Sequence, residues 1–107
     1  MRRILLVIAS TGMLCAGMGT SLALSQASPP TRALLDEYCV TCHSDRLMTG
    51  GLTLEHVDMS DPRGNAELLE KVSRKLRDGL MPPEGRPRPA PSTLDDFVTA
   101  LETALDG

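Results

Sequence analysis

The chain has 107 residues, room for one domain at most, and carries 14 acidic against 11 basic side chains. It has one Tyr, one Phe and no Trp. The acidic balance and the scarcity of aromatic side chains for base stacking argue against a nucleic-acid partner. A small domain with so few large side chains is also expected to need a metal, a disulfide or another staple at its centre.

The first 27 residues are predicted to be a signal peptide, because an Arg-Arg pair precedes an uncharged stretch from Ile4 to Leu24 and small residues precede a cut after Ala27. Residues 28–107 would then form the mature domain, with net charge −5 (9 − 14, without the first two arginines). The alternative is a retained membrane anchor, because the uncharged stretch has 21 residues (24 − 4 + 1), close to the ~20 that span a bilayer. Both alternatives predict export across the inner membrane. A cleaved signal peptide would release the domain to the periplasm or the medium, and a retained anchor would leave it attached to the membrane and facing the periplasm.

The first segment of the domain predicts a short helix that leads into the cysteines. Ser28 or Thr31 is the expected N-cap. The apolar residues that follow have helical spacing and are Leu34, Leu35 and Tyr38. We expect this helix to end near Cys39.

Directly after this helix, Cys39, Cys42 and His43 form Cys-x-x-Cys-His, the attachment pattern of a c-type haem. Two thiols at this spacing can form thioethers with the two vinyl groups of one porphyrin, and the next imidazole then lies under the iron. A redox dithiol, a structural zinc site and a disulfide are the alternatives. The chain lacks the alternating strands and helices of a thioredoxin-like domain, and only His56 is left to help bind zinc. Haem c is therefore favoured.

Glycine and proline residues predict a loop over residues 44–64. A second helix is expected from about Asn65, and Gly79 is its expected stop. Its apolar stripe consists of Leu68, Leu69, Val72 and Leu76. The following MPPEGRPRPAP holds five prolines in eleven residues and predicts an extended loop.

A third helix is predicted at the end of the chain, with Ser92 as N-cap and Asp95 three residues later, similar to a capping box. Its apolar stripe consists of Leu94, Phe97, Val98, Leu101 and Leu105. With three helices and no convincing strand, the predicted fold class is all-α.

A haem iron held by His43 has a further position, for which Met48, Met59, Met81 and His56 are candidates. Met48 follows His43 too closely to pass around the porphyrin edge and is expected to pack as an apolar side chain. Met59 and His56 lie in the middle of a loop with no evident device to hold them. Met81 follows a helix stop, and two prolines directly after it fix the backbone, so it is the favoured ligand.

The stretches YCVTCHSDRLMTGGLTLE and EKVSRKLRDGLMPPEGRPRP, with the closing helix, resemble the planctomycete-type cytochrome c domain, a branch of the class I cytochromes c. The resemblance extends from about Leu34 to Leu105. It implies a small cytochrome c fold of three main helices around one covalent haem, with Cys39 and Cys42 as attachments, His43 as proximal ligand and Met81 as distal ligand. In many relatives this domain begins a much longer protein, so both a free-standing carrier and a remnant of a larger protein stay open.

A His/Met-ligated iron has no free position for a substrate and a raised reduction potential, so the predicted function is electron transfer without enzymatic activity. Redox proteins are the expected partners. The alternatives are an electron-entry or interaction module of a larger secreted oxidoreductase, and, if Met81 does not ligate, an open-site haem enzyme. A basic run could dock an acidic partner, although such charges more often form a solvated face. It comprises Lys71, Arg74, Lys75 and Arg77, with Arg86 and Arg88 in the loop.

Overall fold

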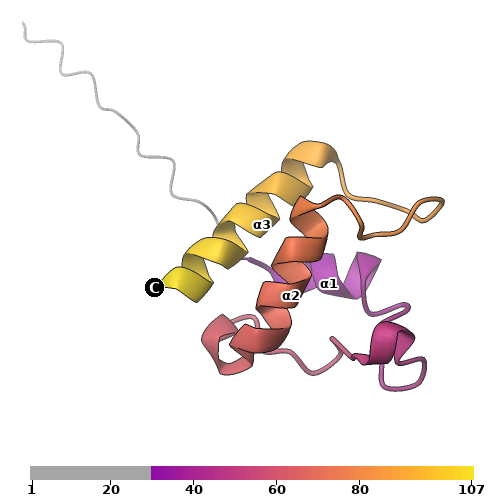
Figure 1. Ribbon diagram of the computed structural model, residues 1–107, viewed down its shortest axis with the longest axis horizontal. Coiled ribbons are helices and arrows are strands. Elements are labelled where there is room, and N and C mark those ends of the chain that lie inside the picture. Colours follow the sequence, from indigo (N-terminus) through magenta and orange to yellow (C-terminus); the bar gives the residue numbers. More distant parts are fainter. Residues whose placement is uncertain (1–29) are drawn as a thin grey trace, which may run out of the picture.

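The computed structural model describes residues 30–107 (Figure 1). Its elements, in chain order, are α1 (Arg32–Tyr38), the 3-10 turns η1 (Thr49–Gly51) and η2 (Pro62–Asn65), α2 (Ala66–Arg77) and α3 (Pro91–Asp106). This part of the chain contains three α-helices and no strand, which confirms the all-α prediction. The expected signal peptide or anchor over residues 1–27 lies outside the described residues.

Helix α1 begins and ends where the sequence indicated. Thr31 is its N-cap with extended backbone (φ −101°, ψ 145°), although its side chain makes no capping hydrogen bond. The helix ends at Tyr38, and Cys39 is its C-cap. Leu34 and Leu35 are buried, so the short helix lays its apolar face on the core.

The core lies between the three helices and is completed by the segment before η2. Helix α2 contributes Leu69 and Leu76, and α3 contributes Phe97, Val98 and Leu101, so both predicted stripes face inward. The other buried members of the cluster are Leu34, Leu35, Leu54, Val57 and Met59. A continuous apolar cluster therefore joins α1, α2, α3 and the connection that follows the cysteines.

The predicted start of α3 at Ser92 is wrong by two residues. The helix begins at Pro91, Ala90 is the N-cap, and no side chain makes a capping hydrogen bond. A proline suits the first helical position, because its φ is already helical and its missing N–H would have no partner there. A residue before proline is driven to extended backbone, as the ψ of 142° at Ala90 shows. Ser92 is thus already inside the helix.

Arg77, at the last position of α2, braces this helix against α3. Its guanidinium forms ion pairs with Asp95 and Glu102 and donates a 3.0 Å hydrogen bond to the hydroxyl of Thr99. The Ser73 hydroxyl donates a 2.9 Å hydrogen bond to Glu102 as well. Arg77 and Ser73 together hold the pKa of the Glu102 carboxyl below its usual value.

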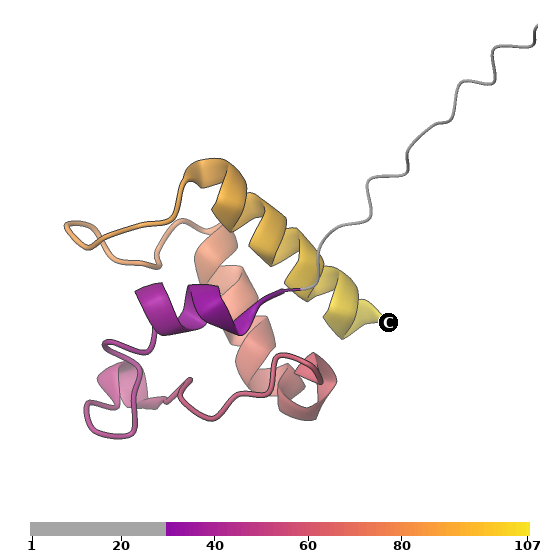
Figure 2. The same ribbon diagram turned by 180° about the vertical axis from the view of Figure 1, so that it is seen from behind.

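Both ribbon views place three segments on the same side of the molecule: the end of α1, the region of η1, and the loop between α2 and α3 (Figures 1 and 2). The C-terminal end of α3 lies on the opposite side. The sequence motifs that predicted haem binding therefore gather on one side of the described domain. None of the helices described over residues 30–107 has the length and hydrophobicity of a transmembrane span.

Candidate functional site

The cysteine motif forms a single helical turn that continues from α1. The backbone N–H groups of Cys39 and Val40 both donate to the carbonyl of Leu35, each at 2.9 Å. Within the motif, the N–H of His43 donates to the carbonyl of Cys39 at 2.9 Å, and that of Cys42 does so at 3.1 Å. Both cysteines and the histidine are partly buried. Helical hydrogen bonding across the motif sets the spacing of the two thiols and the imidazole.

The imidazole of His43 is oriented by a backbone carbonyl. Its Nδ1 lies 2.7 Å from the carbonyl oxygen of Thr49 in η1. A carbonyl only accepts hydrogen bonds, so Nδ1 carries a proton, and in the neutral imidazole this tautomer leaves the lone pair of Nε2 for a metal. Gly50 and Gly51 follow with φ of 71° and 75°, left-handed values that favour glycine, and a Cβ added at Gly50 would lie 3.7 Å from Cε1 of the ring. The glycine pair in the sequence thus turns the chain beside the ligand.

The connection after the cysteine turn, residues 44–61, is here called the middle loop, and its second half is fastened to α1 by Arg32. The Arg32 guanidinium donates to the carbonyl oxygens of Leu54 at 2.8 Å, Glu55 at 2.7 Å and Val57 at 3.0 Å. The N–H of Leu54 in turn donates to the carbonyl of His43 at 2.8 Å. Arg32 thus holds the segment that supports the backbone of His43.

This role of Arg32 is not evident from the amino-acid sequence, because its carbonyl partners lie more than twenty positions away in the chain. One local signal was present. Arg32 stands in the first turn of α1, where the helix macrodipole disfavours a positive charge. A positive charge at this position is stabilised when carbonyl oxygens from another segment accept its hydrogen bonds.

The connection between α2 and α3, residues 78–90, is here called the α2–α3 loop, and it starts with a Schellman motif. The N–H of Leu80 donates to the carbonyl of Lys75 at 3.0 Å, and that of Gly79 to Leu76 at 3.1 Å. Gly79 has a φ of 68°, which confirms it as the helix stop. Met81 follows, joined to Pro82 by a cis peptide bond, and its partly buried side chain packs against the core cluster.

The other candidate ligands have different surroundings. Met59 is buried, with 9% of its surface exposed, and belongs to the core cluster. Met48 is 44% exposed, has left-handed backbone and lies outside the core cluster. His56 is paired with Asp45. Among the four candidates, Met81 alone combines partial burial with a place next to the helix stop.

Residues 39–85 match the family model of planctomycete cytochrome C. The matched segment begins at the first cysteine of the motif and continues through the middle loop and α2 into the α2–α3 loop. The chain contains a planctomycete-type cytochrome c domain. The match confirms the resemblance seen in the sequence, over a shorter range than Leu34 to Leu105. Comparisons with curated proteins and with solved structures found no match for this chain.

A cytochrome c domain of this family binds haem covalently, and the residues of this chain fit that group. Cys39 and Cys42 are free thiols on one turn, and Nε2 of His43 keeps its lone pair. Three large apolar side chains are exposed in the same parts of the chain, namely Leu47, Met48 and Leu80. Two thiols on one turn with an imidazole beside them are the donors that a covalently bound haem requires, and exposed apolar side chains are suited to contact a porphyrin.

The chemistry of Cys39 argues against a redox dithiol in this cytochrome domain. Burial raises the pKa of the Cys39 thiol to about 11, because the thiolate would be desolvated. Catalytic CxxC dithiols instead have a thiol whose pKa is lowered toward or below neutrality. A zinc site is not supported either, because the cluster of metal-ligating side chains found among residues 30–107 includes neither cysteine.

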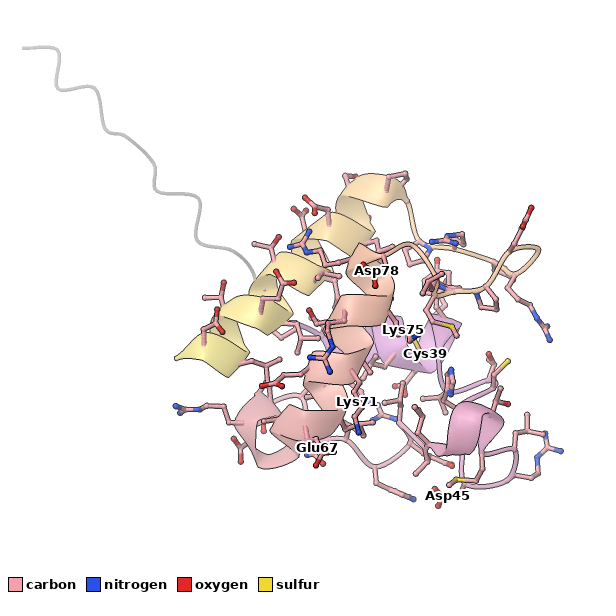
Figure 3. The ribbon with its side chains drawn as sticks, viewed as in Figure 1. Cys39, Asp45, Glu67, Lys71, Lys75 and Asp78 are labelled. Carbon is pink, nitrogen blue, oxygen red and sulfur yellow. The ribbon has the colours of Figure 1, made fainter. Side chains whose placement is uncertain are left out.

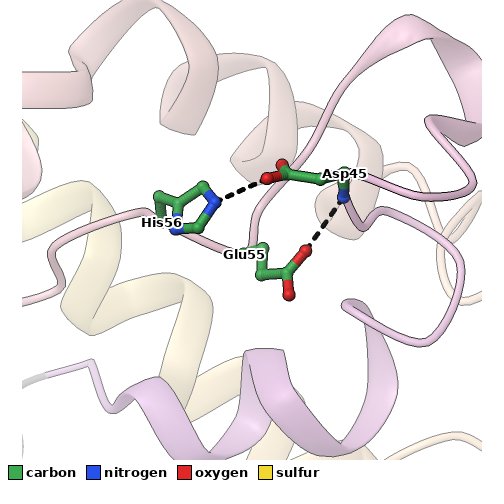
Figure 4. A group of neighbouring side chains, drawn as sticks. All are labelled: Asp45, Glu55 and His56. Carbon is green, nitrogen blue, oxygen red and sulfur yellow. Dashed lines mark hydrogen bonds and ion pairs between the residues drawn. The ribbon is translucent and has the colours of Figure 1, made fainter.

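That cluster consists of Asp45, Glu55 and His56 in the middle loop (Figure 4). Nε2 of His56 lies 2.6 Å from the Asp45 carboxylate, and the backbone N–H of Asp45 donates to Glu55 at 2.9 Å. The pKa of His56 is raised chiefly by its hydrogen bond with Asp45. With 73% of its side chain exposed, His56 is a surface residue that joins the two halves of the loop.

The basic run of α2 is largely neutralised by neighbouring acids. Lys71 pairs with Glu67 at 2.9 Å, Arg74 lies 3.9 Å from Glu70, and Arg77 braces α3. Figure 3 shows Glu67, Lys71 and Lys75 following one another along this helix, with Asp78 at its C-cap. Within the described chain, Lys75 is the member of the helical run without an ion pair. The face is one of mixed charge, so it lends little support to docking of an acidic partner.

Proposed function

We propose that this protein is an exported, mono-haem c-type cytochrome that transfers electrons through an iron held by His43 and Met81. The observation that carries the proposal is the hydrogen bond from Nδ1 of His43, at the end of the cysteine turn, to the carbonyl of Thr49 in η1. It fixes the tautomer and the ring direction that a metal-ligating histidine needs. Neither a redox dithiol nor a disulfide requires a histidine with a fixed tautomer and ring direction.

Each residue has a distinct part in the proposed function. The Sγ–H groups of Cys39 and Cys42 add across the two vinyl groups, which gives two C–S bonds and makes attachment permanent. Nε2 of His43 is the proximal donor, and the thioether of Met81 is the distal donor. The haem supplies a one-electron Fe(III)/Fe(II) couple, and a His/Met donor pair raises its reduction potential. With both positions filled by protein, electron transfer needs no substrate site.

The proposed partners are redox proteins, a donor and an acceptor. The one-electron couple itself supports this proposal, because an iron that cycles between Fe(III) and Fe(II) must receive its electron from one species and pass it to another. The proposed location is outside the cytoplasmic membrane, supported by the signal-like sequence of residues 1–27. Retention of that segment as an anchor would leave the domain facing the periplasm.

The proposal is tested by producing the protein together with haem-maturation machinery. Acid-acetone extraction should leave the colour with the protein, and the intact mass should exceed that of the chain by one haem. A redox titration should show a single one-electron couple, and the reduced protein should not bind carbon monoxide at an appreciable rate. Extraction of the haem would contradict covalent attachment. Rapid binding of carbon monoxide would instead favour the open-site haem enzyme.

A further inference from the structure

Arg88 lies on the return half of the α2–α3 loop and reaches across to its outgoing half. One guanidinium nitrogen, Nη1, donates to the carbonyl oxygen of Pro82 at 2.6 Å. The other, Nη2, donates to the carbonyl of Met81 at 3.4 Å, and both nitrogens lie 3.5 Å from the carbonyl of Gly79. One side chain therefore contacts three carbonyl groups on either side of the Met81 side chain.

These carbonyl groups have few other partners available. Pro82 and Pro83 have no N–H, so this part of the loop cannot form a regular hydrogen-bonded ladder. A planar guanidinium with five donors in a fixed fork is suited to several carbonyl oxygens at once, and each hydrogen bond is charge-assisted. The remaining backbone bond in the loop joins Arg86 N–H to the carbonyl of Pro83 at 3.2 Å, farther from Met81.

The backbone on the Arg88 side is also restrained. Arg88 stands between Pro87 and Pro89, so the φ angles on both sides of it are fixed by proline rings. Pro89 and Pro82 are both buried, and they anchor the two halves of the loop to the protein. Because little backbone freedom is left at Arg88, holding its side chain across the loop costs less entropy than in a flexible segment.

We propose that Arg88 is a positioning residue for Met81, which holds the thioether at the iron. The proposal rests on the proposed ligation by Met81. A thioether is a weak neutral ligand, and an added base such as imidazole competes with it. The more firmly the loop is held in one conformation, the less often the position opens. Arg88 contacts the carbonyl of Met81 itself and those of Gly79 and Pro82, so its loss frees the segment that carries the ligand.

Two variants of Arg88 and a matched control separate positioning from charge. Arg88→Gln removes the charge and the fork. Arg88→Lys keeps the charge but replaces the fork by a single ammonium group. Arg86→Gln makes the same charge change in the same loop, at a side chain without a hydrogen bond or ion pair in the described part of the chain. All three are made in the holo-protein with its haem attached.

The measurement is a titration of the ferric proteins with imidazole. Its signal is the loss of the weak charge-transfer band that a Met thioether gives at the red end of the spectrum. We expect Arg88→Gln to bind imidazole about tenfold more tightly than wild type, the scale of one lost charge-assisted hydrogen bond. The imidazole affinity of Arg88→Lys should lie between those of Arg88→Gln and wild type, and that of Arg86→Gln should stay within about twofold of wild type. On heating, Arg88→Gln should lose the band at a lower temperature while its helical circular dichroism melts nearly as in wild type.

Two results would overturn the proposal, and they have different meanings. If wild type shows the band and Arg88→Gln titrates like Arg86→Gln, Arg88 does not position Met81, although Met81 ligation stands. A lower melting temperature for band and helices together in Arg88→Gln would also count against positioning, since it would show a general loss of stability. If wild type lacks the band, ligation by Met81 fails, and the role of Arg88 fails with it.

Discussion

The middle loop and the α2–α3 loop are both long connections, but they are held in different ways. The middle loop contributes Leu54, Val57 and Met59 to the buried core, and Arg32 ties its carbonyl groups to α1. The α2–α3 loop contributes two buried prolines, while Leu80 next to Met81 is 52% exposed. The middle loop is held by buried apolar side chains and by Arg32. The α2–α3 loop is held by buried prolines, a Schellman motif and Arg88.

This difference bears on the two methionines. Met59 sits where a side chain is needed to fill the core, and methionine does this well because it is flexible and apolar. Met81 sits on a loop whose backbone is restrained by prolines, a Schellman motif and Arg88, so its thioether is not needed to hold the loop in place. A methionine is therefore more informative as a ligand candidate when something other than its own burial fixes its backbone.

Loss of the haem is expected to have the largest effect, because both loops would lose the group that they are proposed to enclose. In a Cys39→Ala, Cys42→Ala variant we expect no covalent haem and largely lost helical circular dichroism. A domain this small has only a few kcal/mol of stability to lose, and two aromatic residues leave its core poor in large side chains. A retained cooperative melting transition would show that the ten buried apolar side chains of the core cluster suffice without the haem.

Replacing each of the two methionines by alanine tests whether Met81 is the ligand and Met59 a core residue. Met81→Ala should abolish the red charge-transfer band, lower the reduction potential and allow small ligands to bind the iron. Met59→Ala should keep the band but lower the free energy of unfolding by about 2–5 kcal/mol, the usual cost of emptying a core position. Chemical denaturation and the ferric spectrum measure both. Loss of the band in Met59→Ala would mean that the middle loop supplies the ligand. His56→Ala, a control at the surface, should keep the band.

Local features of the fold were predictable from the sequence, and contacts between distant segments were not. The CxxCH turn, the apolar stripe of α2 and the stop at Gly79 depend on residues a few positions apart, so their signals lie within one stretch of sequence. Arg32 and Arg77 find partners 18 to 25 positions away, and nothing in the chain marks those partners in advance. The start of α3 was misplaced because Pro91 outweighed a favourable capping residue at Ser92.

Removing the Arg32 clamp should loosen the middle loop and leave the α2–α3 loop as it is. Arg32→Met deletes three charge-assisted hydrogen bonds to backbone carbonyls and the exposed 2.7 Å ion pair with Asp36, but keeps an apolar stem. We expect the free energy of unfolding to fall by about 2 kcal/mol. The loss is no larger because water can hydrogen-bond to part of the freed carbonyl groups. The red band should persist. Arg46→Met, a matched control on the exposed part of the same loop, should have little effect. Equal losses in the two variants would show that the clamp contributes nothing specific.

The smallest expected effect concerns the brace below the α2–α3 loop, where Arg77 and Glu102 hold the helices that the loop connects. The pKa of Glu102 is lowered in the folded state by the hydrogen bonds from Arg77 and Ser73. A lowered pKa means that the pair stabilises the fold fully above the unfolded value, near 4.5. That stability is lost as the pH falls through the folded value.

Because both side chains are more than a third exposed, solvent screening makes this effect smaller than those of the preceding variants. Glu102→Gln should therefore melt at a lower temperature than wild type at pH 7, and the difference should disappear well below pH 4. An unchanged difference at acid pH would show that Glu102 stabilises the brace without its charge.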